Sequence, residues 1–211
     1  MTKKTVLCFG DSITWGYNPA NQNRMAWDER WTGVLTNGLN DNYIVIEEGL
    51  KGRTTTWNDP VDGASKNGLN YLIPCLESHK PIDLCILLLG LNDLKKRFSL
   101  PSVEIARGIT VIIEVIKKSG TGIKGSAPKI LLLTPPIINP VEGLSQEFRN
   151  SHNKSRKLPG YYAKIARNYG LEFLDISKII TVSELDGVHI DVEEQFKLGN
   201  LVLKKVKHIL E

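Results

Sequence analysis

The sequence lacks any apolar segment long enough to cross a membrane. A membrane-spanning helix needs about 20 consecutive apolar residues, and no part of the 211-residue chain approaches this length. Lys3 and Lys4 make the start basic, as in a secretory signal, but the apolar stretch at 5–9 that follows is too short for one. We therefore expect a cytoplasmic protein that makes no contact with a membrane.

Cysteine is also scarce in this chain. The three cysteines, Cys8, Cys75 and Cys85, are an odd number and show no C-x-x-C spacing, which argues against a disulfide framework and against a zinc site. Two of them lie in apolar runs, where a thiol behaves as a small hydrophobic group. We expect all three to be buried, reduced and inert, and we expect no metal ion and no cofactor.

No large excess of one charge is present. Lys and Arg number 27 against 23 for Asp and Glu, and the formal net charge of +4 is spread along the chain. A scattered charge of this size favours a solvated surface over a nucleic-acid interface. Hydrophobic residues make up 41% and charged residues 24% of the chain, as in ordinary globular proteins. A chain of this length commonly forms one domain, and we assign 1–211 to a single domain.

Apolar runs alternate with helical patterns along the whole sequence. Five runs are typical of buried parallel strands, at 5–9, 43–47, 84–89, 129–134 and 171–174. Helical patterns occupy 30–39, 68–78, 102–118 and 159–169, and a last one follows Asp191 and ends near Leu210. This alternation predicts an α/β protein with three layers, in which helices cover both faces of a parallel sheet.

The sequence also predicts one helix cap and three long loops. Asp191, with Glu194 three residues later, predicts a capping box at the start of the last helix. Three long loops at 15–28, 54–66 and 135–158 interrupt the alternation, and the third is expected to contain a short helix near 145–149. Loops of this length in a compact domain often form lids or pocket walls.

Four short motifs follow the predicted strands or precede the last helix. They are Gly-Asp-Ser at 10–12, Gly-Leu-Lys-Gly at 49–52, Gly-Leu-Asn-Asp at 90–93 and Asp-Gly-Val-His at 186–189. The carboxyl ends of parallel strands meet at one edge of a sheet, where ligands bind. The motifs are therefore predicted to gather into one site.

The residue types in these motifs are those of a serine hydrolase. A serine hydroxyl is a weak nucleophile at neutral pH and needs a base, which His189 can supply to Ser12. The imidazole must in turn be held in the correct tautomer by an acceptor, and Asp186 lies three residues upstream in the same turn. Gly187 lets that turn be tight because glycine has no Cβ atom.

Attack on an ester carbonyl builds negative charge that fixed donors must stabilise. The backbone N–H groups of Ser12 and Gly52 and the side-chain amide of Asn92 are the candidates for this oxyanion hole. Asp11 and Asp93 are expected to accept hydrogen bonds from loop amides and to hold Ser12 and Asn92 in place.

These motifs resemble those of the SGNH, or GDSL-type, hydrolase superfamily over nearly the whole chain. The segments at 11–16, 30–35, 47–50 and 53–55 further resemble the bacterial aryl esterase and acyltransferase branch. The resemblance implies a flavodoxin-like sheet and an acyl-enzyme on Ser12. It also implies cleavage or transfer of short acyl groups from small esters to water or an alcohol, and a cytosolic homo-oligomer. Many members carry serine where this chain has Lys51, so specificity is not simply carried over.

Three neighbours of the motif residues are candidates for substrate binding. Leu91 and Val188 are expected to wall the acyl site, and Trp15 either lines an acyl pocket or packs in the core. The other histidines, His79, His152 and His208, are interpreted as structural or solvated.

Other functions stay open at this point. The same constellation serves carbohydrate acetyl esterases, and a catalytically silent binding protein could share the fold. A metal-dependent phosphoesterase is the weakest alternative, since acidic residues cluster with histidine only at Asp186, Asp191 and His189.

Overall fold

The computed structural model describes residues 3–211, so Met1 and Thr2 of the predicted domain lie outside the described residues. Five parallel strands form one sheet in the order β2-β1-β3-β4-β5. Their bounds are Lys4–Gly10 for β1, Tyr43–Gly49 for β2, Leu84–Leu88 for β3, Lys129–Leu133 for β4 and Glu172–Leu174 for β5. This order is that of flavodoxin-like sheets. The central strand β3 is buried at every position, because helices cover both of its faces.

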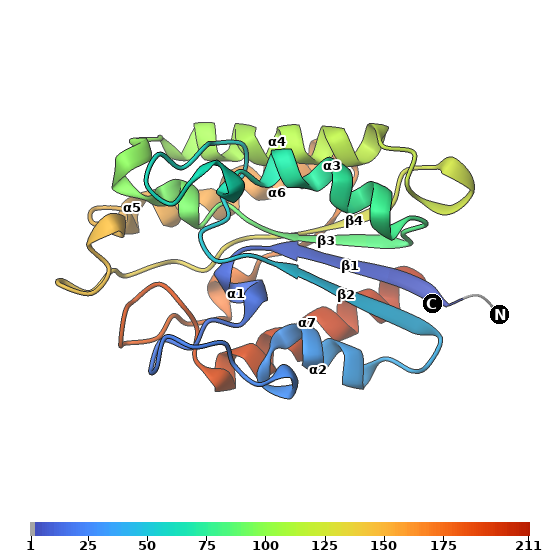
Figure 1. Ribbon diagram of the computed structural model, residues 1–211, viewed down its shortest axis with the longest axis horizontal. Helices are drawn as coiled ribbons and strands as arrows, with labels where there is room; N and C mark the ends of the chain where they lie inside the picture. The colour runs from blue at the N-terminus through green and yellow to red at the C-terminus, as the bar shows by residue number, and fades with distance from the viewer. Residues whose placement is uncertain (1–2) are drawn as a thin grey trace.

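Helices lie on both faces of the sheet (Figure 1). One face carries α2 (Trp31–Gly38) and α7 (Val192–Leu210), and the other carries α3 (Gly68–His79), α4 (Ser102–Lys118) and α6 (Leu158–Tyr169). Two short helices, α1 (Ser12–Trp15) and α5 (His152–Ser155), lie beyond the carboxyl ends of the strands. Short 3-10 helices occupy Trp27–Glu29, Ala64–Lys66, Asn92–Leu94, Lys96–Phe98, Ile123–Gly125, Gln146–Phe148 and Ile176–Lys178.

The apolar periodicity explains why these segments adopt these structures. The buried side of α4 is formed by the isoleucines that recur at helical spacing, namely Ile105, Ile109, Ile112, Ile113 and Ile116. Cys8, Cys75 and Cys85 are buried and unbridged, as predicted. None of the described helices is both long and apolar enough to span a bilayer.

The α/β class, the three layers and the five parallel strands are confirmed. Each predicted strand and long helix is present with ends within two residues of the expectation, and a short 3-10 helix lies in the third loop. The capping box at α7 is wrong. The Asp191 side chain makes no capping hydrogen bond, and the Glu194 carboxylate instead accepts the backbone N–H of Thr181 at 2.9 Å. A tertiary contact with the preceding loop has replaced the local one.

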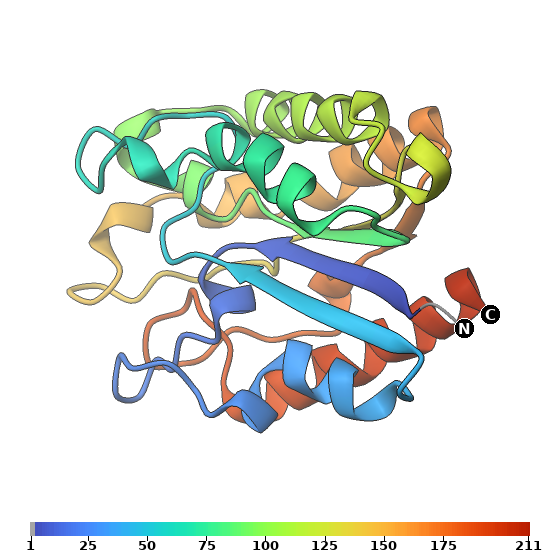
Figure 2. The same ribbon diagram turned by 45° about the vertical axis from the view of Figure 1, so that its right-hand side comes forward.

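The sheet register aligns the carboxyl ends of the three strands that precede the motifs at 10–12, 49–52 and 90–93. Gly10 pairs with Gly49 on one side and with Leu88 on the other, so β1, β2 and β3 end side by side. The long loops extend from this same end of the sheet (Figure 2). The fold therefore places the predicted site beyond the carboxyl ends of the strands, among the loops.

Candidate active site

Ser12 lies where β1 ends and the chain turns into α1. The Asp11 side chain accepts the backbone N–H of Ile13 at 3.0 Å and so begins the short helix. Backbone N–H groups of Trp15 and Gly16 then donate to the carbonyls of Asp11 and Ser12. The expectation that Asp11 braces the serine loop is confirmed by these bonds.

Ser12, His189 and Asp186 form a continuous hydrogen-bonded chain. Ser12 Oγ lies 3.0 Å from His189 Nε2, although the two residues are 177 positions apart. His189 Nδ1 lies 2.6 Å from Asp186 Oδ2. This is the geometry in which an imidazole takes a proton from a hydroxyl while a carboxylate fixes its tautomer.

The Asp186 carboxylate is held by more than the imidazole. Its Oδ1 accepts the backbone N–H groups of Val188 and His189, both at 2.9 Å. Burial alone would raise the pKa of Asp186, but the hydrogen bond and charge of His189 and the two backbone donors outweigh burial, and the pKa is lowered. The carboxylate therefore stays ionised and oriented towards the imidazole.

Gly187 makes this turn possible, as predicted. Its φ angle is +68°, and a Cβ atom added there would lie 1.7 Å from the carbonyl oxygen of Asn139. Asn139 N–H donates to the Gly187 carbonyl at 2.7 Å, which ties the histidine turn to the third long loop. Any side chain at this position would push these two segments apart.

The three predicted oxyanion donors, Ser12, Gly52 and Asn92, line one cavity together with His189. Gly52 has φ +80° in a tight turn in which Arg53 N–H donates to the Leu50 carbonyl at 3.1 Å. Among residues 3–211, neither the Ser12 N–H nor the Gly52 N–H donates to a protein acceptor. Asn92 Nδ2 donates one hydrogen to the Arg53 carbonyl at 3.1 Å, and the amide has a second hydrogen to offer.

Two buried carboxyl groups support the loops that carry Ser12 and Asn92. Burial raises the pKa of Asp11 to about 7, although the Ile13 N–H and the nearby Arg53 act in the opposite direction. Burial also raises the pKa of Asp93 to about 6, against the hydrogen bonds donated by the side chain and backbone of Thr55. Asp93 thus connects the Asn92 turn to the loop after β2.

These raised pKa values predict that stability falls as the pH rises. Between about pH 4, where an unfolded aspartate titrates, and about pH 7, the folded state binds more protons than the unfolded state, so the free energy of unfolding decreases with pH. We expect Asp11→Asn to reduce the loss of stability between pH 5 and pH 8, measured by urea unfolding. The exposed Asp41→Asn variant is the control. An equal loss of unfolding free energy in Asp11→Asn and Asp41→Asn between pH 5 and pH 8 would show that the buried Asp11 carboxyl does not cause the pH dependence.

The cavity around Ser12 has a volume of about 390 Å³. Its walls include residues from all three long loops, as the loop lengths led us to expect: Tyr17, Asp62, Lys66, Glu147 and Phe148. Lys51 and Lys95 complete the rim. A larger cavity of about 580 Å³ lies among residues 139–153 and is lined by none of the predicted catalytic residues.

Tyr17 is a site residue that sequence reasoning missed. Its ring centre lies 4.0 Å from that of His189, and the planes are tilted by 36°. Phe148 was missed as well. Both lie in loops that the sequence marked as pocket walls, but no spacing pattern singles out the residues that face inward.

None of the three predicted substrate-binding residues lines the cavity that holds Ser12. Leu91 is fully buried in the core, and Trp15 is half-buried with the Lys51 ammonium 5.3 Å from its ring centre. Val188 lines an adjoining hollow together with Tyr17. A role for these three side chains in substrate binding stays a prediction.

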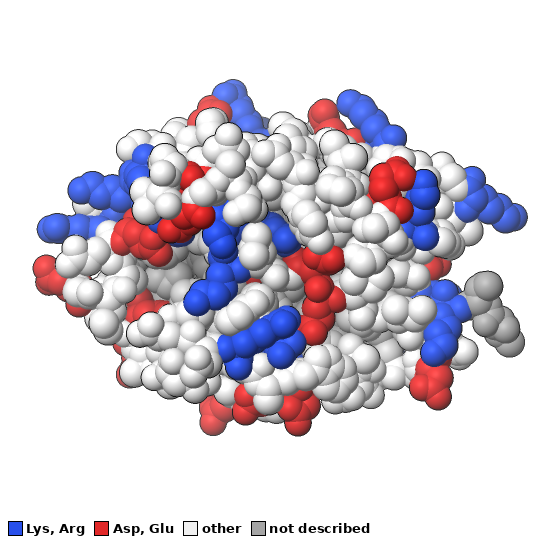
Figure 3. Space-filling model, in the orientation of Figure 1, with Lys and Arg blue, Asp and Glu red and all other residues white. Residues whose placement is uncertain are grey.

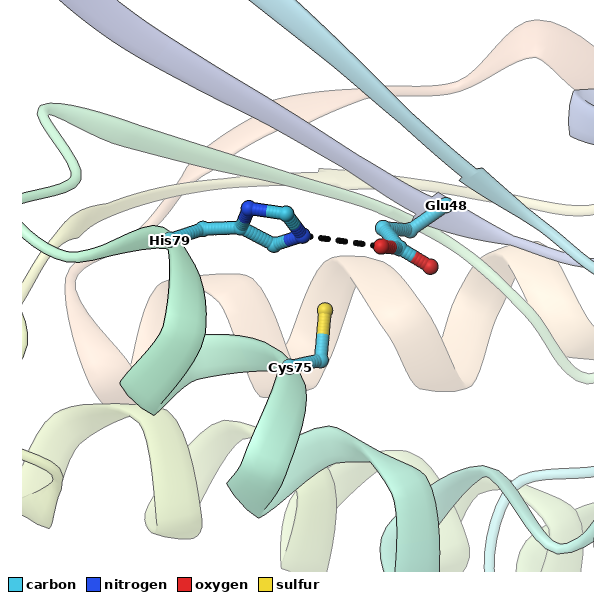
Figure 4. A group of neighbouring side chains, drawn as sticks. All are labelled: Glu48, Cys75 and His79. Carbon is cyan, nitrogen blue, oxygen red and sulfur yellow. Dashed lines mark hydrogen bonds and ion pairs between the residues drawn. The ribbon is translucent and has the colours of Figure 1, made fainter.

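One other cluster has the chemistry of a metal site. The ligand atoms of Glu48, Cys75 and His79 all lie within 4.8 Å of one another, and His79 Nε2 is 2.9 Å from Glu48 Oε1 (Figure 4). Oxygen, sulfur and nitrogen ligands suit zinc. Burial and the Glu48 charge raise the pKa of Cys75 to about 12, and the Arg53 guanidinium adds a positive charge beside it. In this structure the cluster consists of a His–Glu hydrogen bond beside a buried free thiol.

The fold and the hydrogen-bonded Ser–His–Asp chain together define a class of enzyme, the SGNH-type serine hydrolases on a flavodoxin-like sheet. The model of the GDSL-like lipase/acylhydrolase family matches residues 8–193. The chain belongs to this family and is a carboxylic ester hydrolase. A search of curated proteins finds no match.

Several solved structures similar to this chain are described as esterases. Est24, a carbohydrate acetylesterase from Sinorhizobium meliloti, is 36% identical with a TM-score of 0.94, and the match covers 99% of this chain and 100% of that one. The native aryl esterase of M. smegmatis is 36% identical with a TM-score of 0.92, covering 98% and 100%. A second carbohydrate acetylesterase family member from S. meliloti is 31% identical with a TM-score of 0.93, covering 98% and 99%.

Proposed function

We propose that this enzyme hydrolyses or transfers short acyl groups of small carboxylic esters through an acyl-enzyme on Ser12. The observation that carries the proposal is the chain of contacts from Ser12 Oγ through His189 to Asp186, with distances of 3.0 Å and 2.6 Å. A cavity of about 390 Å³ beside Ser12 suits a small ester.

The reaction follows from the geometry in two steps. Ser12 Oγ attacks the ester carbonyl while His189 Nε2 accepts its proton, and the negative charge on the carbonyl oxygen is stabilised by the N–H groups of Ser12, Gly52 and Asn92. The tetrahedral species collapses, the acyl group stays on Ser12, and the alcohol leaves with the proton from His189. Water or a second alcohol then gives a proton to His189 and attacks the acyl carbon. The second tetrahedral species collapses, His189 returns the proton to Ser12 Oγ, and the carboxylic acid or new ester leaves.

A fluorophosphonate probe tests the proposal directly, because it reacts with an activated serine. We expect stoichiometric labelling of the native protein, with the adduct on the peptide that contains Ser12, and loss of phenyl acetate turnover in step with labelling. A native protein that turns over phenyl acetate without being labelled at Ser12 would overturn the mechanism. A native protein that turns over neither phenyl acetate nor an acetylated xyloside would favour a catalytically silent binding protein.

Asn92→Ala should lower kcat for phenyl acetate by about 100- to 1000-fold, as loss of a single oxyanion donor does in other enzymes. The side chain also donates to the Arg53 carbonyl at 3.1 Å, so the thermal midpoint must be measured beside the rate. The exposed Asn70→Ala variant is the matched control. A folded Asn92→Ala variant with an unchanged rate would remove Asn92 from the oxyanion hole.

Deacetylation of carbohydrates is the second candidate function. It is supported by the description of Est24 as a carbohydrate acetylesterase, at the same 36% identity as the aryl esterase. The two candidates differ in the alcohol that leaves. The ratio of kcat/KM for an acetylated xyloside to that for phenyl acetate separates them.

Several finer features belong to the same proposal. The single domain at 1–211 rests on the length of the chain. The resemblance supports the homo-oligomer, the cytoplasmic location and the transfer of acyl groups to alcohols. Light scattering tests the oligomer, cell fractionation tests the location, and product analysis with a competing alcohol tests acyl transfer. Water and a small-molecule ester are the partners that the proposed reaction requires.

A further inference from the structure

Two lysines border the cavity from the loops that follow β2. Lys51 is exposed in the tight turn that also carries Gly52, and Lys66 is half-buried at the end of the 3-10 helix Ala64–Lys66. Both side chains line the same cavity as Ser12. The proposed mechanism uses neither of them.

The Lys51 ammonium is held beside the imidazole that protonates the leaving alcohol. Its Nζ lies 4.6 Å from the ring centre of Tyr17 and 5.3 Å from that of Trp15, within the range of cation–π attraction. The Tyr17 ring in turn lies 4.0 Å from the ring of His189. This series of contacts places a positive charge near His189, the residue that protonates the leaving alcohol in the proposed mechanism.

Lys66 approaches the cavity next to an oxyanion donor. A Cβ atom added to Gly52 would lie 3.5 Å from Lys66 Cδ and 3.6 Å from Cε, so the lysine chain passes over the glycine at van der Waals distance. The Lys66 side chain therefore borders the cavity beside the turn that carries Lys51 and Gly52. Two lysines thus line the cavity close to Gly52.

The other charges of the cavity are already paired. Lys95 Nζ lies 2.8 Å from Asp62 and 3.6 Å from Glu147. Arg97 Nη2 lies 3.1 Å from Asp62 and 2.7 Å from Glu147. Lys95 and Arg97 also lie within 4 Å of the carboxylate of the buried Asp59, at 3.8 Å and 3.4 Å. These carboxylates are thus engaged by Lys95 and Arg97, and Asp62 Oδ2 also lies 3.7 Å from the position of a Cβ atom added to Gly52, next to the Lys66 chain.

Within the described part of the chain, 3–211, Lys51 and Lys66 form no ion pair. Figure 3 shows basic and acidic side chains around the mouth of the hollow in this face of the molecule. Lys66 is nevertheless close enough to Asp62 to help lower the pKa of that carboxyl. Among the described residues, the four cations Lys51, Lys66, Lys95 and Arg97 thus share the three carboxylates of Asp59, Asp62 and Glu147, which leaves positive charge for a bound ligand.

We propose that Lys51 and Lys66 bind an anionic group, a carboxylate or a phosphate, on the alcohol portion of the substrate. The preferred substrates are then acyl esters of anionic alcohols or phenols. This inference rests on the proposed function, because it concerns the leaving group of that reaction. The anion replaces water around the two ammonium groups while the ester carbonyl lies at Ser12.

Three acetate esters of similar size test the proposal: 4-acetoxybenzoate, 4-acetoxyphenyl phosphate and the neutral 4-acetoxybenzamide. The measured quantity is kcat/KM for each anionic ester divided by that for the neutral ester. We expect this ratio to fall about tenfold in the Lys51→Gln/Lys66→Gln double variant, mainly through KM, as for partly exposed ion pairs. It should also fall in the native enzyme as salt is raised, because salt screens the attraction.

Lys51→Arg should keep most of the preference for anionic esters, because it keeps the positive charge. Lys164→Gln removes one positive charge on the exposed face of α6 and should leave the ratio unchanged. A Lys-dependent preference for only one of the two anionic esters identifies the anion and supports the proposal. If the ratio of kcat/KM for the anionic esters to that for the neutral ester is the same in the native enzyme and the double variant, the anion-binding proposal is overturned. That result would leave the acyl-enzyme mechanism unaffected. Absence of turnover on all three esters would count against the proposed function instead.

Discussion

Ser12→Ala should lower kcat for phenyl acetate by about 10⁴- to 10⁶-fold, the range seen when the nucleophile of a serine triad is removed. Without Oγ no acyl-enzyme forms, and the oxyanion donors can assist only direct attack by water. The loss should be chemical and not structural. Ser12 is buried, its side chain bonds only to His189 among the described residues, and alanine fits the same space.

The measurement is the initial rate, read together with fluorophosphonate labelling and the thermal midpoint. Ser65→Ala is a matched control, because Ser65 is exposed in the second long loop and does not line the cavity. A folded Ser12→Ala protein that kept a tenth of the native rate would show that another group is the nucleophile.

Asp186→Asn should lower kcat by about 10⁴-fold with little change in shape, as the same change does in other triads. Oδ1 accepts two backbone N–H groups at 2.9 Å, so the amide oxygen of the asparagine must occupy that position. Its NH2 group then faces His189 Nδ1 and forces that nitrogen to be the acceptor. Nε2 would carry the hydrogen and could not take the proton of Ser12.

The exposed Asp41→Asn variant controls for the loss of one charge. The rate should be followed from pH 6 to pH 9 together with the urea midpoint. Retention of a tenth or more of the native rate by a folded Asp186→Asn variant would mean that another acceptor orients His189.

The strands and long helices could be predicted because their signals are local. A parallel sheet covered on both faces requires continuous apolar runs, and β1, β3 and β4 show them. The roles of Ser12 and His189 were also open to prediction, since few residue types can perform those chemical steps. Asp11 and Asp93 were expected as braces, and Asp11 bonds to the serine helix while Asp93 bonds to Thr55.

Features that depend on side-chain direction could not be predicted. Leu91 and Val188 were chosen because they adjoin Asn92 and His189 in sequence, but the 3-10 turn at Asn92 directs Leu91 into the core. The capping box at α7 was wrong because Glu194 accepts the backbone N–H of Thr181 in the preceding loop, and the Asp191 side chain makes no capping bond.

The amino-acid sequence by itself determined the α/β class, the element boundaries and the chemical parts of the site, because apolar periodicity and short motifs act over a few neighbouring residues. Only the tertiary structure decided that Ser12 and His189 share a hydrogen bond across 177 positions, and that Tyr17, Lys51 and Lys66 surround them. Those distances depend on how β1 lies between β2 and β3 and on how the loops turn back over the sheet, which are properties of the packed chain as a whole.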